Sequence, residues 1–180
     1  LVSGPTALAP PDGVRVRAVE TAREMHDAVM AELPGSAIFI ATAAVADYRP
    51  AAPAAQKMKR DGSTLELKLL PNPDILAAVA AVPSPPFTVG FAAETNDVEH
   101  HARIKLAKKR IDMIAANQVG AGLAFDCDDN ALTVYWPDGK RELPRAPKAR
   151  LAADLIAVIA ERYSARGTRP VAVVERTAAR

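Results

Sequence analysis

Two groups of basic residues are the side chains in this sequence best suited to chemistry. The first is the KMKR run at 57–60, and the second is Lys105, Lys108 and Lys109. Lys105 and Lys109 are four residues apart and would share one face of a helix, where like charges are mildly destabilising unless an anion lies between them. Such clusters are either solvent-exposed basic residues without a ligand or binding sites for a polyphosphate. Two or three lysines could hold a triphosphate without a P-loop.

Four further positions could assist such a site. Asp47 follows an apolar segment and could help to hold Mg²⁺, accept a hydrogen bond from a ribose or base, or cap a turn. The segment 72–74 is expected to start a helix, where backbone N–H groups can bind an anion or simply be capped. Phe91 could stack on a base or belong to the core, and Asn117 could bind a ligand or form a turn.

Several common catalytic motifs are absent. The nine glycines form neither GxxxxGK nor GxGxxG, and no GxSxG pattern occurs. The three histidines, His26, His100 and His101, have no partners at zinc-binding spacing. The single cysteine, Cys127, cannot form an internal disulfide, and its acidic neighbours disfavour the thiolate, which fits a structural thiol in a reduced, cytoplasmic protein.

Composition narrows the class of protein. The 180 residues are 49% apolar and 24% charged, which is typical of a globular domain. A net charge of +2 and an aromatic content of 4% argue against a nucleic-acid partner. No run approaches eighteen consecutive apolar residues, so no membrane span is expected.

Hydrophobic periodicity predicts alternating strands and helices. Strands are expected at 14–19, 36–41 (buried on both faces), 64–70, 87–92 and 112–116, with a hairpin over 130–143. One helix is expected to begin at a capping box formed by Thr21 and Glu24, and a second to follow an N-cap at Asn72, with Pro73 at its first position. Two more helices are expected over 97–109 and 147–163. The segment 43–56 is expected to be a long loop.

This order predicts an α/β protein with a Rossmann-like three-layer fold, a mainly parallel sheet and a small β-hairpin extension. Ligands of such sheets bind at the carboxyl ends of the strands, where 43–47, 92–95 and Asn117 are expected to converge. We expect one nucleotide-binding domain over 1–166 and a loose tail over 167–180. Because Leu1 and Val2 are typical of the end of a strand, we also expect a preceding segment to be missing.

Five segments together resemble a known enzyme family. They are AAVADYRP at 43–50, KMKR at 57–60, NPDIL at 72–76, GFAAET at 90–95 and the run from Lys108 to Asn117. In this order they resemble bacterial phosphopantothenate–cysteine ligase, which is often the carboxy-terminal half of a bifunctional protein that also carries a flavin decarboxylase. The similarity extends from Ser3 to about Tyr163.

The resemblance implies a reaction and its partners. CTP would activate the carboxylate of 4′-phosphopantothenate as an acyl-cytidylate and release pyrophosphate, and L-cysteine would then displace CMP to give 4′-phosphopantothenoyl-cysteine. Mg²⁺ would accompany CTP, and FMN would be present only where the decarboxylase domain is attached. The family is dimeric, with the loop that carries Lys57 reaching toward the neighbouring subunit's substrate.

The resemblance also assigns residues. The nucleotide pocket would be lined by Ala41, Thr42, Ala43 and Asp47, and Asp47 would also bind the metal. The cytosine and ribose would be surrounded by Pro73, Asp74, Ile75, Leu76 and Phe91. Lys57 would contact phosphates and serve catalysis, and Lys105 and Lys109 would hold the triphosphate.

Three alternatives stand beside this interpretation. The chain could be a nucleotide-binding fragment without catalysis, or a relative that uses ATP. It could also be an oxidoreductase on a similar sheet, but the missing GxGxxG motif disfavours that class.

Overall fold

The computed structural model describes residues 1–53, 56–59, 62, 64–119 and 128–167, which form two compact units. The first unit comprises Leu1–Phe91 and Lys105–Asp112, and the second comprises Ala92–Ile104 and Met113–Arg180. Strand β6 (Phe87–Glu94) and helix α3 (Val98–Lys109) contribute residues to both. All residues that we expect to bind nucleotide belong to the first unit.

The amino-terminal part of the first unit follows the sequence prediction closely. Strand β1 (Val2–Ser3) pairs in parallel with β2 (Arg17–Ala18), inside the strand expected at 14–19. Helix α1 (Ala22–Glu32) begins with the expected capping box. Its apolar stripe packs on helix α2 (Ile75–Ala80), with Val29 buried against Ile75 and Val79.

Strand β3 (Ile38–Ile40) pairs in parallel with β6, so that Ile38 lies opposite Phe87 and Ile40 opposite Val89. The residues of β6 from Phe87 to Gly90 are buried, as predicted for 87–92. Those of β3 are only partly buried, so the expectation of a strand covered on both faces is wrong for 36–41.

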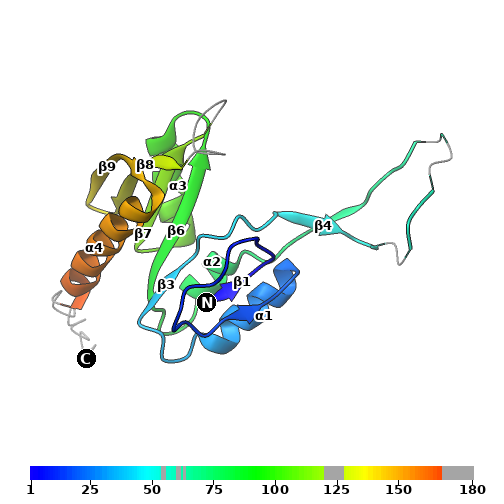
Figure 1. Cartoon of the computed structure of the whole chain (residues 1–180), viewed down its shortest axis with the longest axis horizontal. Helices are drawn as coiled ribbons and strands as arrows, with labels where there is room; N and C mark the ends of the chain where they lie inside the picture. Colours follow the sequence, from blue (N-terminus) through cyan, green and yellow to red (C-terminus); the bar gives the residue numbers. More distant parts are fainter. Residues whose placement is uncertain (54–55, 60–61, 63, 120–127, 168–180) are drawn as a thin grey trace, which may run out of the picture. The chain divides into compact units, whose positions relative to one another are not determined.

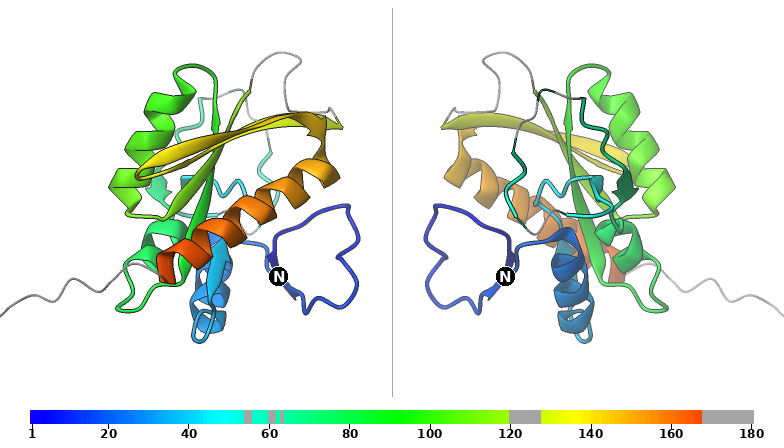
Figure 2. Two further views of the ribbon diagram at one scale, coloured as in Figure 1. Left: turned by 90° about the vertical axis from the view of Figure 1, so that its left-hand side faces the viewer. Right: turned by 90° about the vertical axis from the view of Figure 1, so that its right-hand side faces the viewer.

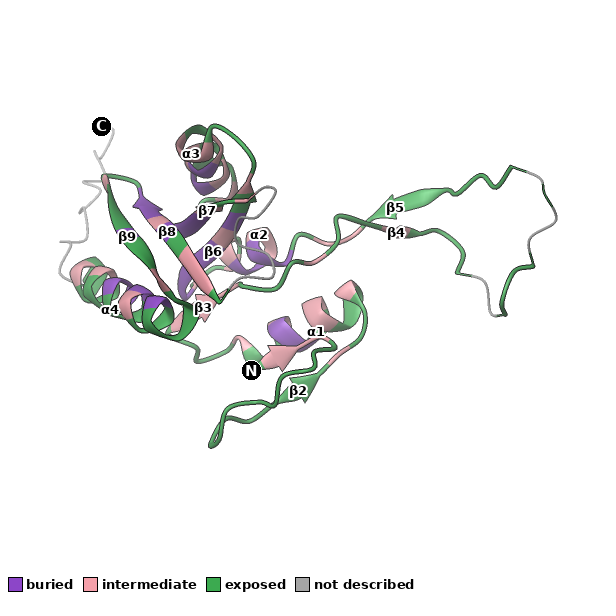
Figure 3. Cartoon of the chain, turned by 45° about the horizontal axis from the view of Figure 1, so that its top comes forward, coloured by how far each residue is buried: buried purple, intermediate pink, exposed green. Residues whose placement is uncertain are grey.

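A pair of short strands replaces part of the expected loop and strand. Strand β4 (Tyr48–Pro50) pairs antiparallel with β5 (Leu69–Pro71) (Figures 1 and 3), and we call these two strands and the described residues between them the arm. The prediction of a strand over 64–70 is therefore wrong for 64–68. The alternating leucines have the right period, but Pro50 and Pro53 lack the N–H groups that a longer ladder would need.

The second unit is built on an antiparallel hairpin. Strand β7 (Met113–Gln118) pairs with β8 (Asp129–Trp136), which pairs with β9 (Gly139–Pro147). Helix α4 (Lys148–Gly167) lies across the hairpin (Figure 2) and buries Leu151, Leu155, Val158 and Ile159. Val119 N donates to Glu94 O at 2.9 Å, so the end of β6 lies beside the end of β7.

These strands share one sheet of order β3-β6-β7-β8-β9, and the α/β fold class is confirmed. The sheet is mixed, because the predicted hairpin joins it as antiparallel strands. Across the described residues, no helix is both long and apolar enough to span a bilayer. Cys127, Arg60 and the predicted tail from 168 onward lie outside the described residues.

Candidate functional site

The predicted nucleotide-binding residues at 41–43 and 91 lie at the carboxyl ends of two parallel strands. Ala41 N donates to Val89 O at 2.8 Å, which extends the β3–β6 pairing by one residue. Thr42 and Ala43 follow as exposed residues, and Phe91 is half-buried. Strand ends of this kind are where open α/β sheets bind ligands.

Gly90 allows two segments to approach strand β6 closely. A Cβ atom at Gly90 would lie 2.6 Å from Leu76 Cδ2 and 3.1 Å from Ile111 Cδ1. Any larger residue would therefore displace the start of α2 or the chain after α3. Because Gly90 has no side chain, Leu76 and Ile111 can both pack directly on strand β6.

Helix α2 begins differently from the prediction. Its N-cap is Asp74, whose Oδ1 accepts from Ala77 N at 3.1 Å. The expected cap at Asn72 is wrong, because that side chain is held elsewhere: Nδ2 donates to Ala46 O at 2.8 Å and Oδ1 accepts from Arg49. Asn72 thus joins the start of the arm to the approach to α2, and Pro73 precedes the cap.

The most informative contact of the first unit joins Lys109 to Asp74. Lys109 Nζ lies 3.0 Å from Asp74 Oδ2 and 3.1 Å from Oδ1. The last turn of α3 and the N-cap of α2 therefore meet. Lys105, one turn earlier on α3, is half-buried.

The end of α3 is fixed by its backbone. Arg110 N donates to Ala107 O at 3.2 Å and Ile111 N to Leu106 O at 3.3 Å, which is the Schellman pattern of a helix terminus. Arg110 takes the left-handed conformation, with a φ of 54°, at the position where glycine is usual. Leu106 and Ile111 are both buried, as this motif favours.

A buried threonine and a half-buried aspartate tie the residue after this terminus to β6. Asp112 Oδ2 accepts from Thr88 N at 2.8 Å and from Thr88 Oγ1 at 2.9 Å. In return, Asp112 N donates to Thr88 Oγ1 at 3.2 Å. Thr88 is only 1% exposed and Asp112 is half-buried, so the threonine end of these bonds is shielded from water.

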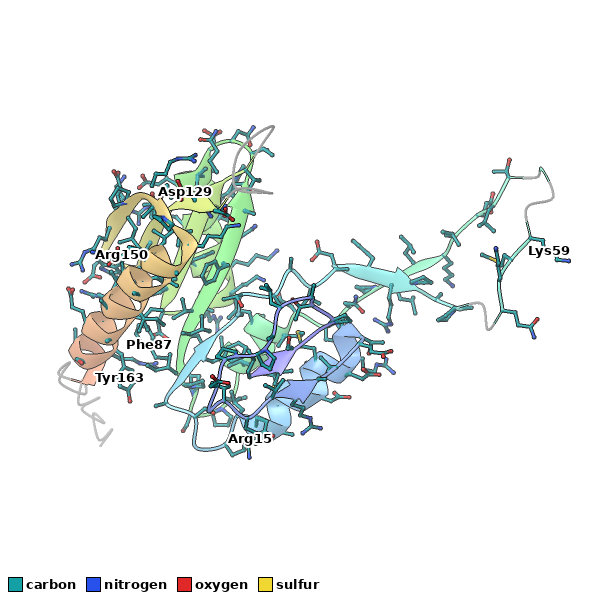
Figure 4. The ribbon with its side chains drawn as sticks, in the orientation of Figure 1. Arg15, Lys59, Phe87, Asp129, Arg150 and Tyr163 are labelled. Atoms are coloured by element: carbon teal, nitrogen blue, oxygen red, sulfur yellow. The ribbon has the colours of Figure 1, made fainter. Side chains whose placement is uncertain are left out.

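The described part of the basic run comprises Lys57, Met58 and Lys59. Lys57 and Lys59 are exposed, and within the described residues Lys57 has no hydrogen bond or ion pair. Lys59 lies at the far end of the arm (Figure 4). The side chain of Asp47 is also exposed, while its carbonyl oxygen accepts from Asn72 N at 2.8 Å.

Sequence reasoning missed Gly90, Thr88 and Asp112 as parts of this site. A glycine in the middle of an apolar strand marks close backbone approach, which could have singled out Gly90. A threonine within such a strand is an isolated buried polar residue that needs a partner. Nothing in the local pattern identifies Asp112 as that partner, because the two are 24 residues apart.

The described residues contain no group of three or more His, Cys, Asp or Glu side chains that could hold a metal by themselves. One exposed carboxylate, that of Asp47, fits the usual protein share of a magnesium site, in which substrate phosphates and water supply most ligands.

These features define an α/β domain in which an ion pair joins the ends of two helices beside strand β6. Residues 1–163 match the family described as DNA/pantothenate metabolism flavoprotein C-terminal domain, and the chain belongs to that family.

Relatives and solved structures agree with this assignment. The chain is 52% identical over 165 residues to the coenzyme A biosynthesis bifunctional protein CoaBC of Vibrio cholerae, covering 89% of this chain and 41% of that protein. With the Escherichia coli protein of the same name, identity is 45% over 174 residues, covering 94% and 43%. The chain therefore spans about two fifths of these curated relatives.

The crystal structure of the C-terminal domain of a CoaBC protein matches with a TM-score of 0.74 and 34% identity, covering 91% of this chain and 74% of that one. A Cab2 variant in complex with phosphopantothenate-cysteine shares the fold, with a TM-score of 0.63 and 15% identity, covering 85% and 55%.

Proposed function

We propose that this chain carries a CTP-dependent phosphopantothenate–cysteine ligase activity and serves coenzyme A biosynthesis. Family membership and the names of the relatives support the pathway. The observation that carries the proposal is the Lys109–Asp74 contact, because it joins two predicted nucleotide-binding segments 35 residues apart.

The chemistry needs no nucleophile from the protein. The carboxylate of 4′-phosphopantothenate attacks the α-phosphorus of CTP, and the bond to pyrophosphate breaks. The amine of L-cysteine, having lost a proton, then attacks the acyl carbon, and CMP leaves with the electrons of the broken C–O bond. The protein supplies position and positive charge, which fits a site rich in lysine.

Lys109 can exchange Asp74 for a phosphate at small cost. The two side chains are 29% and 48% exposed, and ion pairs of that kind contribute about 0–1 kcal/mol. A charge-assisted hydrogen bond to a phosphate contributes about 1.5–3 kcal/mol. Triphosphate binding therefore outweighs loss of the ion pair, with Lys105 placed one turn away to add a second contact.

The other predicted residues take roles around that contact. Ala41, Thr42, Ala43 and Phe91 line the strand ends. The cytosine and ribose would lie against Pro73 and the backbone of Ile75 and Leu76, because the side chains of those two residues are buried in the core. Asp47 supplies the one protein carboxylate for Mg²⁺, which would neutralise charge on the phosphates.

Lys57 acts from the arm, and we propose that it does so in a homodimer. Leucines of the arm are unusually exposed: Leu65 and Leu67 are each 62% exposed and Leu69 is 51% exposed. Such a run favours burial against another chain, and the arm would carry Lys57 to the substrate of the partner subunit.

The remaining partners follow from the same proposal. The whole protein would join this chain to a flavin decarboxylase domain, which alone would bind FMN. It would act in the cytoplasm, without nucleic acid or membrane.

Product analysis tests the proposed function. The protein is incubated with Mg²⁺, 4′-phosphopantothenate and L-cysteine, with CTP or ATP, and phosphopantothenoyl-cysteine, CMP and pyrophosphate are measured. We expect the amide with CTP, and a Lys109→Ala variant should need about 10-fold or more CTP, whereas the neighbouring control Lys108→Ala should not. Amide formed only with ATP would indicate the ATP-using relative, and no amide with bound CTP would indicate a non-catalytic fragment.

A further inference from the structure

Thr88 and Asp112 lie close to the residues of the proposed site and bond to each other. Both belong to the first unit, and each uses backbone and side chain to bond the other. The Thr88 hydroxyl donates to the Asp112 carboxylate and accepts from the Asp112 N–H, so its direction is fixed by two partners. Because the Thr88 hydroxyl is buried, losing either partner would leave it unsatisfied in a medium of low dielectric constant, and the pair therefore favours one geometry.

The Thr88–Asp112 pair is close along the chain to the lysines proposed to bind phosphate. Asp112 stands three residues after Lys109, and the intervening residues are fixed by the Schellman turn and by the burial of Ile111. Ile111 also lies at the glycine notch of β6, together with Leu76 of α2. Strand, helix end and helix start are therefore held by one continuous set of contacts.

We propose that Thr88 and Asp112 are positioning residues for triphosphate binding. By fixing the end of α3 to β6, they set the place of Lys109 beside Asp74, and that of Lys105 one turn before it. This inference rests on the proposed function, because it assigns the lysines a triphosphate ligand. It goes further in assigning a binding consequence to two residues that do not touch the ligand.

The alternative is that the pair only stabilises the fold. If the pair were purely structural, its loss would weaken the binding of all nucleotides equally, because the whole site would be lost in the unfolded fraction. If the pair positions the lysines, its loss should weaken the binding of a nucleoside triphosphate more than that of a monophosphate. The ratio of CMP to CTP dissociation constants separates the two, since stability effects cancel in it.

The experiment is titration calorimetry of CTP and CMP with Mg²⁺ on the wild type and on Thr88→Val, Thr88→Ser and Asp112→Asn. Valine keeps the volume of threonine and removes the hydroxyl, and serine restores the hydroxyl. We expect Thr88→Val to lower the CMP-to-CTP ratio by about tenfold and Thr88→Ser to restore most of it. Asp112→Asn keeps an acceptor oxygen but loses the charge, and should lower the ratio by a smaller factor.

Thr21→Val is the matched control, because it removes a threonine hydroxyl that accepts from Glu24 N at the start of α1. It should lower the melting temperature and leave the ratio unchanged. An unchanged ratio in Thr88→Val and Asp112→Asn would overturn the inference. Should Thr88→Val fail to fold, Asp112→Asn decides by the same ratio. A wild type that binds CTP no better than CMP would instead overturn the triphosphate site of the proposed function.

Discussion

Lys57 is an exposed lysine on an arm, and its proposed role can be separated from stability. Replacing it with alanine removes no packing and no ion pair with the described residues, so the melting temperature should stay within a degree or two. Turnover should fall by roughly a hundredfold, as for loss of one charge-stabilising group.

The measurement is steady-state ligase activity of Lys57→Ala beside Lys68→Ala, which removes the same charge from another exposed position of the arm. Near-normal turnover in the Lys57 variant would remove this residue from the mechanism.

Arg110 determines how helix α3 ends, which is a question at the scale of elements. A non-glycine residue in the left-handed conformation is strained by about 1 kcal/mol relative to glycine. Arg110→Gly should therefore raise the free energy of unfolding by up to about 1 kcal/mol, measured by urea denaturation. Arg110→Val, which tolerates this conformation worst, should lower it, and a gain in that variant would contradict the account.

The link between α3 and β9 predicts a pH dependence. The hydrogen bond from Lys140, followed by that from Arg103, lowers the pKa of Glu99 from its ordinary value. A carboxyl with a lowered pKa stabilises the fold above its ordinary value, about pH 4.3, and this contribution is lost as the pH falls through the lowered pKa. Glu99→Gln should therefore be less stable than the wild type at pH 7, with a difference that shrinks at pH 3.

Thermal unfolding at several pH values checks this, with Glu142→Gln as the control. Glu142 lies on β9 near Lys140 but makes no ion pair among the described residues. A constant difference between Glu99→Gln and wild type from pH 7 to pH 3 would show that the ion pairs are not its source.

The sequence predicted most elements, because helix stripes, caps and buried strands are local signals. Thr21 with Glu24 marked the start of α1, and the apolar run at 112–116 marked β7. The β4–β5 pairing escaped prediction, because Tyr48 and Pro71 are joined across a long separation that no local period encodes. The same is true of the site: Lys109 and Asp74 were each singled out, but their contact, and the Thr88–Asp112 pair behind it, are properties of the fold.

At the scale of the whole molecule, the arm predicts association. Full burial of one leucine contributes about 1.5–3 kcal/mol, so burying several arm leucines between two subunits gives a substantial driving force. We expect a dimer in analytical ultracentrifugation and a shift to monomer on replacing Leu65 and Leu67 together with glutamine. Leu8→Gln is the control, because Leu8 is 80% exposed but lies outside the arm. A wild type that stays monomeric at micromolar concentration would contradict the dimer.

The most direct test of the central claim is thermal unfolding of the protein with Mg²⁺ and each of CTP, ATP, GTP and UTP. A ligand at a hundred times its dissociation constant stabilises the native state by about 2.7 kcal/mol, which is readily visible as a rise in melting temperature. The account predicts a rise that is clearly largest with CTP. Equal rises with all four nucleotides, or none with any, would contradict a cytidine-triphosphate site in this chain.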